Sequence, residues 1–304
     1  MERRIDAGKV FVFAVLAVDN KKAYDLAVAY RICPHLSRTP PPVFADSKYN
    51  LSALCLRSFR ESLGSLKVKL WIILDSCPQE YEDLFASLWP EDDLVLVRCT
   101  GAGNAATFGR QIEILTTQNE AEFVYVAEDD FFYLPGRFRL MLDLIRNHPD
   151  VDFCSPYDHP DFYNHSFHQH LMRIKVEQGQ AWKTANGTIC TFLTRKATLQ
   201  GTRDTLLSYA RKNSDAGMWL SLTKQHVLNP YDLLTQPFIS PYRGWSLACA
   251  WFFNWRQILF GRRYTLWIPV PSLATHMVAA FLAPHVDWEQ EFRHIEKIPR
   301  PVVS

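Results

Sequence analysis

The chain has 304 residues, 48% of them hydrophobic, which is enough to bury a large core in one big domain or in two closely joined lobes. Its formal net charge is +1, and basic and acidic residues are mixed along the sequence without the basic stripe of a nucleic-acid-binding protein. The seven cysteines form no C-x-x-C pair, which argues against a zinc knuckle and against a disulfide framework. We therefore expect reduced thiols, a cytoplasmic location and no nucleic-acid partner.

An apolar run at Val10–Val18 is too short to span a bilayer. Charged residues precede it, as they do in a signal peptide, but no small-residue cleavage site follows. We expect this run to form the first buried strand. The long connection after it contains Pro40, Pro41 and Pro42 and is expected to lack regular structure.

Apolar strands alternate with amphipathic helices along the first half of the chain, which predicts an α/β fold with a mainly parallel sheet flanked by helices. After the first strand, further strands are predicted at Val68–Leu74, Leu94–Val97 and Phe123–Ala127. Helices are predicted at Tyr49–Leu63, Gln79–Leu88, Ala105–Thr117 and Pro135–Asn147.

The second half is less regular. Residues 156–170 are rich in Asp, His, Tyr and Phe, which is typical of a loop near a site. Extended structure is predicted for Trp182–Thr194, and helices for Thr198–Lys212 and Asp215–Lys224. The sequence contains no internal repeat, low-complexity segment or evident linker, so we expect one continuous domain with a nucleotide-binding half and an acceptor-binding half.

Three carboxylates, Glu128, Asp129 and Asp130, follow the predicted strand Phe123–Ala127. Ligands of open α/β sheets bind outside the carboxyl ends of the strands. Alternation along extended backbone would place Glu128 and Asp130 on one face and Asp129 on the other. An acid-x-acid pair at this edge suits a hard divalent cation that also bridges to substrate phosphates. The alternative is a solvated charge cluster at a turn.

Asp75 and Ser76 follow the predicted strand Val68–Leu74. A carboxylate at that place can accept hydrogen bonds from a nucleotide base or from a ribose hydroxyl. Its alternative role is to cap the helix that follows, as Asp and Ser both do well.

A glycine-rich turn, Gly101–Ala106, follows a predicted strand and opens a helix. It nearly matches the G-x-G-x-x-A dinucleotide fingerprint, so a dinucleotide-dependent oxidoreductase or an S-adenosylmethionine-dependent methyltransferase is a rival interpretation. Alternatively, Gly103 and Asn104 let the backbone approach a phosphate, with Arg110 further along the helix. Arg110 then pairs with pyrophosphate or merely forms a surface ion pair with Glu113.

Two isolated residues in the second half are also candidates for the site. Asp215 lies where a predicted helix begins, so it is either an N-cap or a general base that deprotonates an acceptor hydroxyl. His276 follows an apolar, strand-like run and is either structural or a third metal ligand or phosphate contact.

Between Asp215 and His276, residues 245–267 mix Trp, Phe and Leu with arginines, a composition that fits either core packing or peripheral contact with a membrane interface.

Together these residues resemble the GT-A class of nucleotide-sugar glycosyltransferases, particularly family-2-like enzymes, over residues 45–155 and at isolated positions beyond. In that family a strand-end Asp reads the nucleotide base, as Asp75 would here with Ser76 beside it. A turn containing Gly and Asn leads into a helix with an Arg, as Gly103, Asn104 and Arg110 do. An acid-x-acid motif then holds Mn²⁺ or Mg²⁺ on the donor diphosphate.

The resemblance implies a Rossmann-like GT-A domain with a donor half at 1–155 and an acceptor half at 156–304. It implies transfer from a UDP- or GDP-sugar to a hydroxyl of a glycan or other acceptor, with Asp215 as the base of an inverting reaction. His276 resembles the late His that completes the metal shell in some members. The motif here begins with Glu128, which makes Asp130 the safest single metal ligand.

Two departures from the family pattern stand beside this resemblance. The connection after the first strand is unusually long, and the acid-x-acid motif begins with Glu128. A non-catalytic nucleotide-sugar binding protein therefore stays open as an alternative. A sugar nucleotidyltransferase is disfavoured because no glycine-rich, basic loop follows the first strand.

Overall fold

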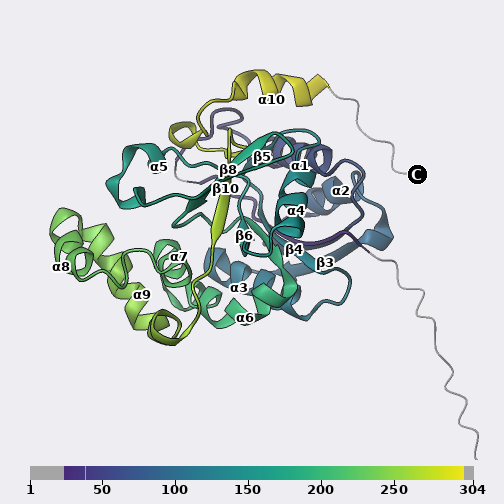
Figure 1. Cartoon of the computed structure of the whole chain (residues 1–304). Coiled ribbons are helices and arrows are strands. Elements are labelled where there is room, and N and C mark those ends of the chain that lie inside the picture. The colour runs from purple at the N-terminus through teal and green to yellow at the C-terminus, as the bar shows by residue number, and fades with distance from the viewer. Residues whose placement is uncertain (1–23, 38, 298–304) are drawn as a thin grey trace, which may run out of the picture.

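The computed structural model describes residues 24–37 and 39–297 (Figure 1). Its strands are β1 (Leu26–Ile32), β2 (Val68–Asp75), β3 (Leu94–Cys99), β4 (Phe123–Glu128), β5 (Phe131–Tyr133), β6 (Phe153–Cys154), β7 (Ile174–Glu177), β8 (Gln180–Ala185), β9 (Phe192–Arg195), β10 (Leu266–Val270) and β11 (Ala274–His276). Its helices are α1 (Lys48–Leu63), α2 (Gln79–Ala86), α3 (Gly103–Thr117), α4 (Phe138–Asn147), α5 (Asp161–Asn164), α6 (Lys196–Leu206), α7 (Asp215–Thr223), α8 (Pro230–Ile239), α9 (Pro241–Phe260) and α10 (Trp288–Lys297).

A central sheet flanked by helices gives the expected α/β fold, with the order β3-β2-β1-β4-β9-β6-β10-β8-β7. The four strands β3, β2, β1 and β4 are parallel to one another. The strand order reverses between β1 and β4, because β2 and β3 extend the sheet to one side and β4 is then added on the other. Open α/β sheets bind their ligands at such a switch point, outside the carboxyl ends of the strands.

Strand β1, which lies between β2 and β4 in this sheet, was not predicted. The expected strand Val10–Val18 lies outside the described residues, and the prediction that the connection after it lacks regular structure is wrong at Leu26–Ile32. All seven residues of β1 are buried. The run contains two alanines, which are poor strand formers, and a charged residue, Arg31, so its sequence predicts a strand only weakly. Its burial between β2 and β4 outweighs this low propensity.

Alternate side chains of β1 face two different helical layers. Val28 and Tyr30 pack into a core with α1, α2 and α4, where Phe59 lies 5.8 Å from the ring of Tyr30. Ala27 and Ala29 face the opposite core, which is formed with α3 and α6. Arg31 belongs to this second face, so its guanidinium points toward the start of α3.

The helices and strands predicted between residues 48 and 147 are confirmed within a few residues. In the second half, the predicted extended segment Trp182–Thr194 divides into β8 and β9, and the predicted helices correspond to α6 and α7. Several elements were not predicted, including the small sheet in which β11 pairs antiparallel with β5. This pairing places His276 opposite Phe131, directly beside the acidic motif.

Candidate functional site

A pocket of about 460 Å³ lies at the carboxyl ends of β1, β2 and β4. Its walls come from the end of β1, the start of α1, the turn before α3 and the acidic motif after β4. The pocket brings together seven of the residues singled out from the sequence: Asp75, Ser76, Gly103, Asn104, Glu128, Asp129 and Asp130.

Asp75 and Ser76 hold the turn that leads into α3. The carboxylate of Asp75 accepts hydrogen bonds from the backbone N–H groups of Ala102 (2.9 Å) and Gly103 (2.7 Å). Ser76 Oγ accepts one from the N–H of Gly101 (2.8 Å). Asp75 therefore caps the approach to α3 and not the helix α2 that follows it in sequence. These three N–H groups are engaged within the protein, whereas the dinucleotide fingerprint needs such groups to bind pyrophosphate.

Replacement of Asp75 by Asn tests this role. The amide keeps one acceptor oxygen and turns a donor toward the other N–H group, so we expect a loss of about 1–3 kcal/mol in the free energy of unfolding. Urea denaturation measures it. The matched control is Asp83→Asn on α2, where the side chain accepts only an exposed hydrogen bond from Gln79. Equal effects of the two substitutions would contradict the capping role.

The first carboxylate of the acidic motif, Glu128, is paired with an arginine. Glu128 forms a buried ion pair with Arg31 and accepts a hydrogen bond from Thr191 Oγ1 (2.8 Å). Arg31 also donates to the backbone carbonyl of Asn104 (2.6 Å). Burial lowers the pKa of Arg31, but the charge and hydrogen bond of Glu128, together with Cys190 and Tyr209, raise it overall. Arg31 thereby joins β1, β4 and the start of α3.

The second carboxylate faces α1. Asp129 pairs with Lys48 Nζ at 2.8 Å and accepts a hydrogen bond from the backbone N–H of Cys33 (3.2 Å). Burial raises the pKa of Asp129, and the charge of Lys48 opposes that rise. Burial also lowers the pKa of Lys48, but the two aspartates outweigh it and raise that pKa overall.

The third carboxylate faces the histidine predicted to be its partner. Asp130 Oδ2 lies 3.1 Å from His276 Nε2, and the backbone carbonyl of Asp130 accepts from Met277 N–H (2.8 Å). Burial alone would raise the pKa of Asp130, but His276, Lys48 and Arg31 together hold it well below its usual range. Burial lowers the pKa of His276, and Asp130 more than reverses this effect.

The three carboxylates do not follow the alternation expected for an extended strand. Strand β4 ends at Glu128, and Asp129 and Asp130 form a turn. Glu128 and Asp130 consequently meet different partners on different elements. The result is a row of three acid–base pairs from Arg31 to His276.

Two residues of this row fit a divalent cation. Asp130 Oδ1 is buried without a hydrogen-bond partner, and His276 lies beside it with Nε2 against Asp130 Oδ2, a contact and a proton that this nitrogen would give up to bind a metal. Glu128 fits less well, because both of its oxygens are engaged. No group of three or more His, Cys, Asp or Glu side chains within residues 24–37 and 39–297 is arranged to hold a metal by itself. Mg²⁺ commonly takes only one or two carboxylates and completes its shell with water and substrate phosphates.

Asp215 lines a second, smaller pocket of about 120 Å³, together with Tyr157, His159 and Tyr242. The N-cap of α7 is Ser214, so the capping role considered for Asp215 belongs to its neighbour. Burial raises the pKa of Asp215, the N–H of Ala216 lowers it, and the charge of Glu128 raises it further. Tyr157, which lines this pocket, packs edge-on against the ring of His276, with 6.4 Å between ring centroids, and His276 in turn pairs with Asp130.

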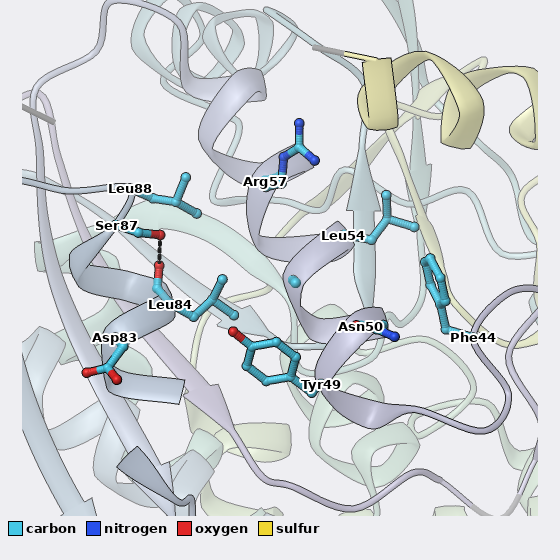
Figure 2. Close-up of a pocket in the computed structure, with 10 residues that line it drawn as sticks. Phe44, Tyr49, Asn50, Leu54, Arg57, Asp83, Leu84, Ser87 and Leu88 are labelled. Carbon is cyan, nitrogen blue, oxygen red and sulfur yellow. Dashed lines mark hydrogen bonds between the residues drawn. The ribbon is translucent and has the colours of Figure 1, made fainter. Parts of the chain in front are cut away.

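His276 lines neither pocket but lies beside Asp130, and Arg110 is the predicted site residue that belongs neither to a pocket nor to the acidic row. It is exposed and pairs with Glu113 at 3.6 Å, the surface alternative considered for it. Figure 2 shows another hollow of about 500 Å³ between α1 and α2, lined by residues such as Tyr49, Leu54 and Leu84. None of the residues singled out from the sequence lines it.

Sequence reasoning missed Arg31, Lys48 and Thr191. A signal was present only for Arg31, the single charged residue in the apolar run that forms β1. Lys48 and Thr191 carry no local pattern, because they reach the acidic motif through the packing of α1 and of the loop before β9.

No protein-family model matches the sequence, and no curated protein matches it. Solved structures with a similar fold include a 4-diphosphocytidyl-2C-methyl-D-erythritol synthase from Anaerococcus prevotii, with a TM-score of 0.39 and 9% identity over 64% of this chain and 81% of that one. A cytidylyltransferase from Leptospira borgpetersenii has a TM-score of 0.34 and 11% identity over 59% and 63%.

The glycosyltransferase GlyE of Streptococcus pneumoniae has a TM-score of 0.35 and 14% identity over 66% of this chain and 43% of that one. Similarity at these values is too weak to assign an activity. The function has to be inferred from the chain's own residues.

Proposed function

We propose that this chain is a metal-dependent glycosyltransferase that moves a sugar from a UDP- or GDP-sugar to a hydroxyl group of a glycan or other acceptor. The observation that carries the proposal is the pocket at the switch point of the sheet. Asp75 and the turn before α3 line it, and so does Asp130, whose Oδ1 is buried and unpartnered. A nucleoside diphosphate has a base at one end and phosphates at the other. Asp75 is suited to the base or ribose, and Asp130 is suited to a cation on the phosphates.

Asp130 and His276 are the residues that would hold a Mn²⁺ or Mg²⁺ ion. When bound, such an ion offsets the charge that develops on the leaving diphosphate. Arg31 and Lys48 neutralise the charges of Glu128 and Asp129, which lowers the energetic cost of burying these carboxylates next to Asp130. The pairing with Arg31 and Lys48 also fixes the turn that carries Asp130.

Asp75 and Ser76 shape the other part of the pocket. Oδ1 of Asp75 accepts from the N–H of Ala102 and from Ser76 Oγ (3.4 Å), whereas Oδ2 accepts only from the N–H of Gly103 and retains a lone pair for a base N–H or a ribose hydroxyl. Gly103 has a φ of 77°, a left-handed conformation that a glycine adopts without strain. A side chain at that position would strain the turn that Asp75 holds.

Asp215 is the proposed base of an inverting reaction. Its pocket contains His159, Tyr157 and Tyr242, which offer hydrogen-bonding groups and aromatic faces for an acceptor sugar. Burial raises its pKa, which strengthens its carboxylate as a proton acceptor. The deprotonated carboxylate takes the proton of the acceptor hydroxyl as that oxygen attacks the anomeric carbon.

The rival enzymes fit these contacts less well. A dinucleotide- or S-adenosylmethionine-dependent enzyme would use the N–H groups of the turn before α3, which Asp75 and Ser76 already engage. A nucleotidyltransferase would need a glycine-rich loop after β1, and residues 33–47 contain no glycine. A non-catalytic nucleotide-sugar binding protein has no use for Asp215.

The substitution Asp215→Asn separates the enzyme from a binding protein. We expect it to reduce donor hydrolysis or transfer by about 10²–10⁴-fold, the usual contribution of a general base, while nucleotide binding is unchanged. In the wild type, activity should rise with pH through the pKa of Asp215, at a pH above the ordinary value of 3.8 for an Asp. The measurement is kcat as a function of pH for both proteins. Turnover by the variant at the wild-type rate would remove Asp215 from the base role.

A further inference from the structure

Helices α8 and α9 expose many large apolar side chains, unlike a typical helix on a soluble surface. Helix α9 buries Leu247, Cys249, Ala250 and Ile258, but both helices also bury polar residues. Of the ten residues of α8, Gln236 is the buried one. In α9, Ser246 and Asn254 are buried, and the amide of Asn254 donates to Ser208 Oγ (3.1 Å) and Ser221 Oγ (3.2 Å). Figure 1 shows the two helices at one end of the molecule, beyond α7.

The outward side of this helix pair carries large apolar residues that continue from one helix to the other. Phe238 at the end of α8 is 92% exposed, and Phe252 in the middle of α9 is 78% exposed. We call the exposed side chains Leu234, Phe238, Trp245, Phe252, Trp255 and Phe260 the α8–α9 surface. On α9, Trp245 and Phe252 precede a kink at Asn254, Trp255 and Phe260 follow it, and all four side chains are exposed. Several adjacent side chains of this size are a mark of an interaction site.

The positive charge of the arginines around this surface favours an anionic partner. Residues 241–263 contain four arginines and neither Asp nor Glu. Arg262 is paired with Asp152, and Arg256 lies over the ring of Trp255 at 5.3 Å. A second copy of the chain would bring arginine-rich surfaces against each other, which disfavours a symmetric dimer. Anionic headgroups complement the arginines, and Trp and Phe suit the boundary between headgroups and acyl chains.

We propose that the α8–α9 surface binds an anionic lipid bilayer, with the two helices lying in the membrane interface. In the part of the chain that the structure describes, no helix has the length and apolar character to cross a bilayer. In the proposed mode of binding, side chains of a helix pair that lies on the membrane insert into the interface.

This geometry also bears on the acceptor. Tyr242, at the start of α9, is exposed and lines the pocket that contains Asp215. A protein docked through α9 would hold that pocket beside the headgroups. This consequence rests on the proposed function and points to an acceptor at the membrane surface, whereas binding to vesicles does not depend on catalysis.

The test is co-sedimentation of the full chain with vesicles of phosphatidylcholine alone or with an equal part of phosphatidylglycerol. We expect binding to the anionic vesicles that weakens in high salt. The double variant Phe238→Ser/Phe252→Ser should weaken binding at least about tenfold, because two exposed aromatic anchors are lost. The matched control is Val176→Ser on the edge strand β7, an exposed apolar residue outside the surface (68% exposed) that should bind as wild type.

Equal binding of the double variant and the wild type would overturn the proposal. So would a wild type that ignores anionic vesicles and forms a dimer in light scattering that the double variant dissociates, since the partner would then be a second copy. Because both phenylalanines face outward, thermal melting of the variant should match the wild type and exclude unfolding as the cause.

Discussion

Replacement of Asp130 by Asn is expected to reduce sugar transfer or donor hydrolysis by about 10³-fold at saturating donor. A cation at this place supplies several kcal/mol of charge stabilisation to the leaving diphosphate, and each 1.4 kcal/mol is a factor of ten in rate. The substitution removes the negative charge beside His276 and one oxygen of the proposed metal site. Steady-state kinetics with a range of Mn²⁺ concentrations measures the loss.

The matched control for this experiment is Asp161→Asn. Asp161 lines the neighbouring pocket with Asp215 but has no contact with the acidic row, and its nearest charged partner is His159 at 3.5 Å. This control should keep the Mn²⁺ dependence of the wild type, whatever its effect on the acceptor. If Asp130→Asn kept most of the turnover and the same Mn²⁺ dependence, Asp130 would not be the metal ligand.

Replacement of Arg31 by Met is expected to destabilise the fold by about 3–5 kcal/mol, because it leaves the carboxylate of Glu128 buried without its cation. It also removes the hydrogen bond from Arg31 to the carbonyl of Asn104. Chemical denaturation without ligands measures the loss. The double variant Arg31→Met/Glu128→Gln should recover much of it, because the amide carries no charge and still accepts from Thr191.

Arg110→Met is the matched control for Arg31. It removes the same charge from an exposed pair with Glu113, for which the usual cost is below about 1 kcal/mol. A similar loss in both single variants, or a double variant less stable than Arg31→Met, would show that the ion pair with Glu128 does not hold β1 to β4.

Apart from the short strand β5, the order of strands and α-helices from α1 to α4 could be predicted from the sequence, because apolar runs and helical periods mark these elements. Because Asp75 and the Glu128–Asp130 motif both follow predicted parallel strands, they could be placed at the same edge of the sheet. Local patterns suffice for such predictions, since parallel strands bring their carboxyl ends together.

Other parts of the site depend on long-range packing that no local pattern records. Arg31 was missed because its strand was missed, and Lys48 reaches Asp129 only through the docking of α1. Helix α9 was recognised only as a region rich in aromatic residues, because apolar side chains lie on both its exposed and its buried side and leave no clear helical period. Arg110 was placed near a phosphate by its distance along the helix, but it lies on the exposed side of α3.

The central claim is that a divalent cation at Asp130 holds the diphosphate of a nucleotide-sugar donor. Thermal unfolding of the wild type and of Asp130→Asn, with UDP or GDP in Mn²⁺ or in EDTA, tests it most directly. We predict that nucleotide stabilises the wild type only with Mn²⁺, by about 2.7 kcal/mol at a concentration of one hundred times Kd, and leaves the variant unchanged. Equal stabilisation in EDTA, or in the variant, would contradict the account.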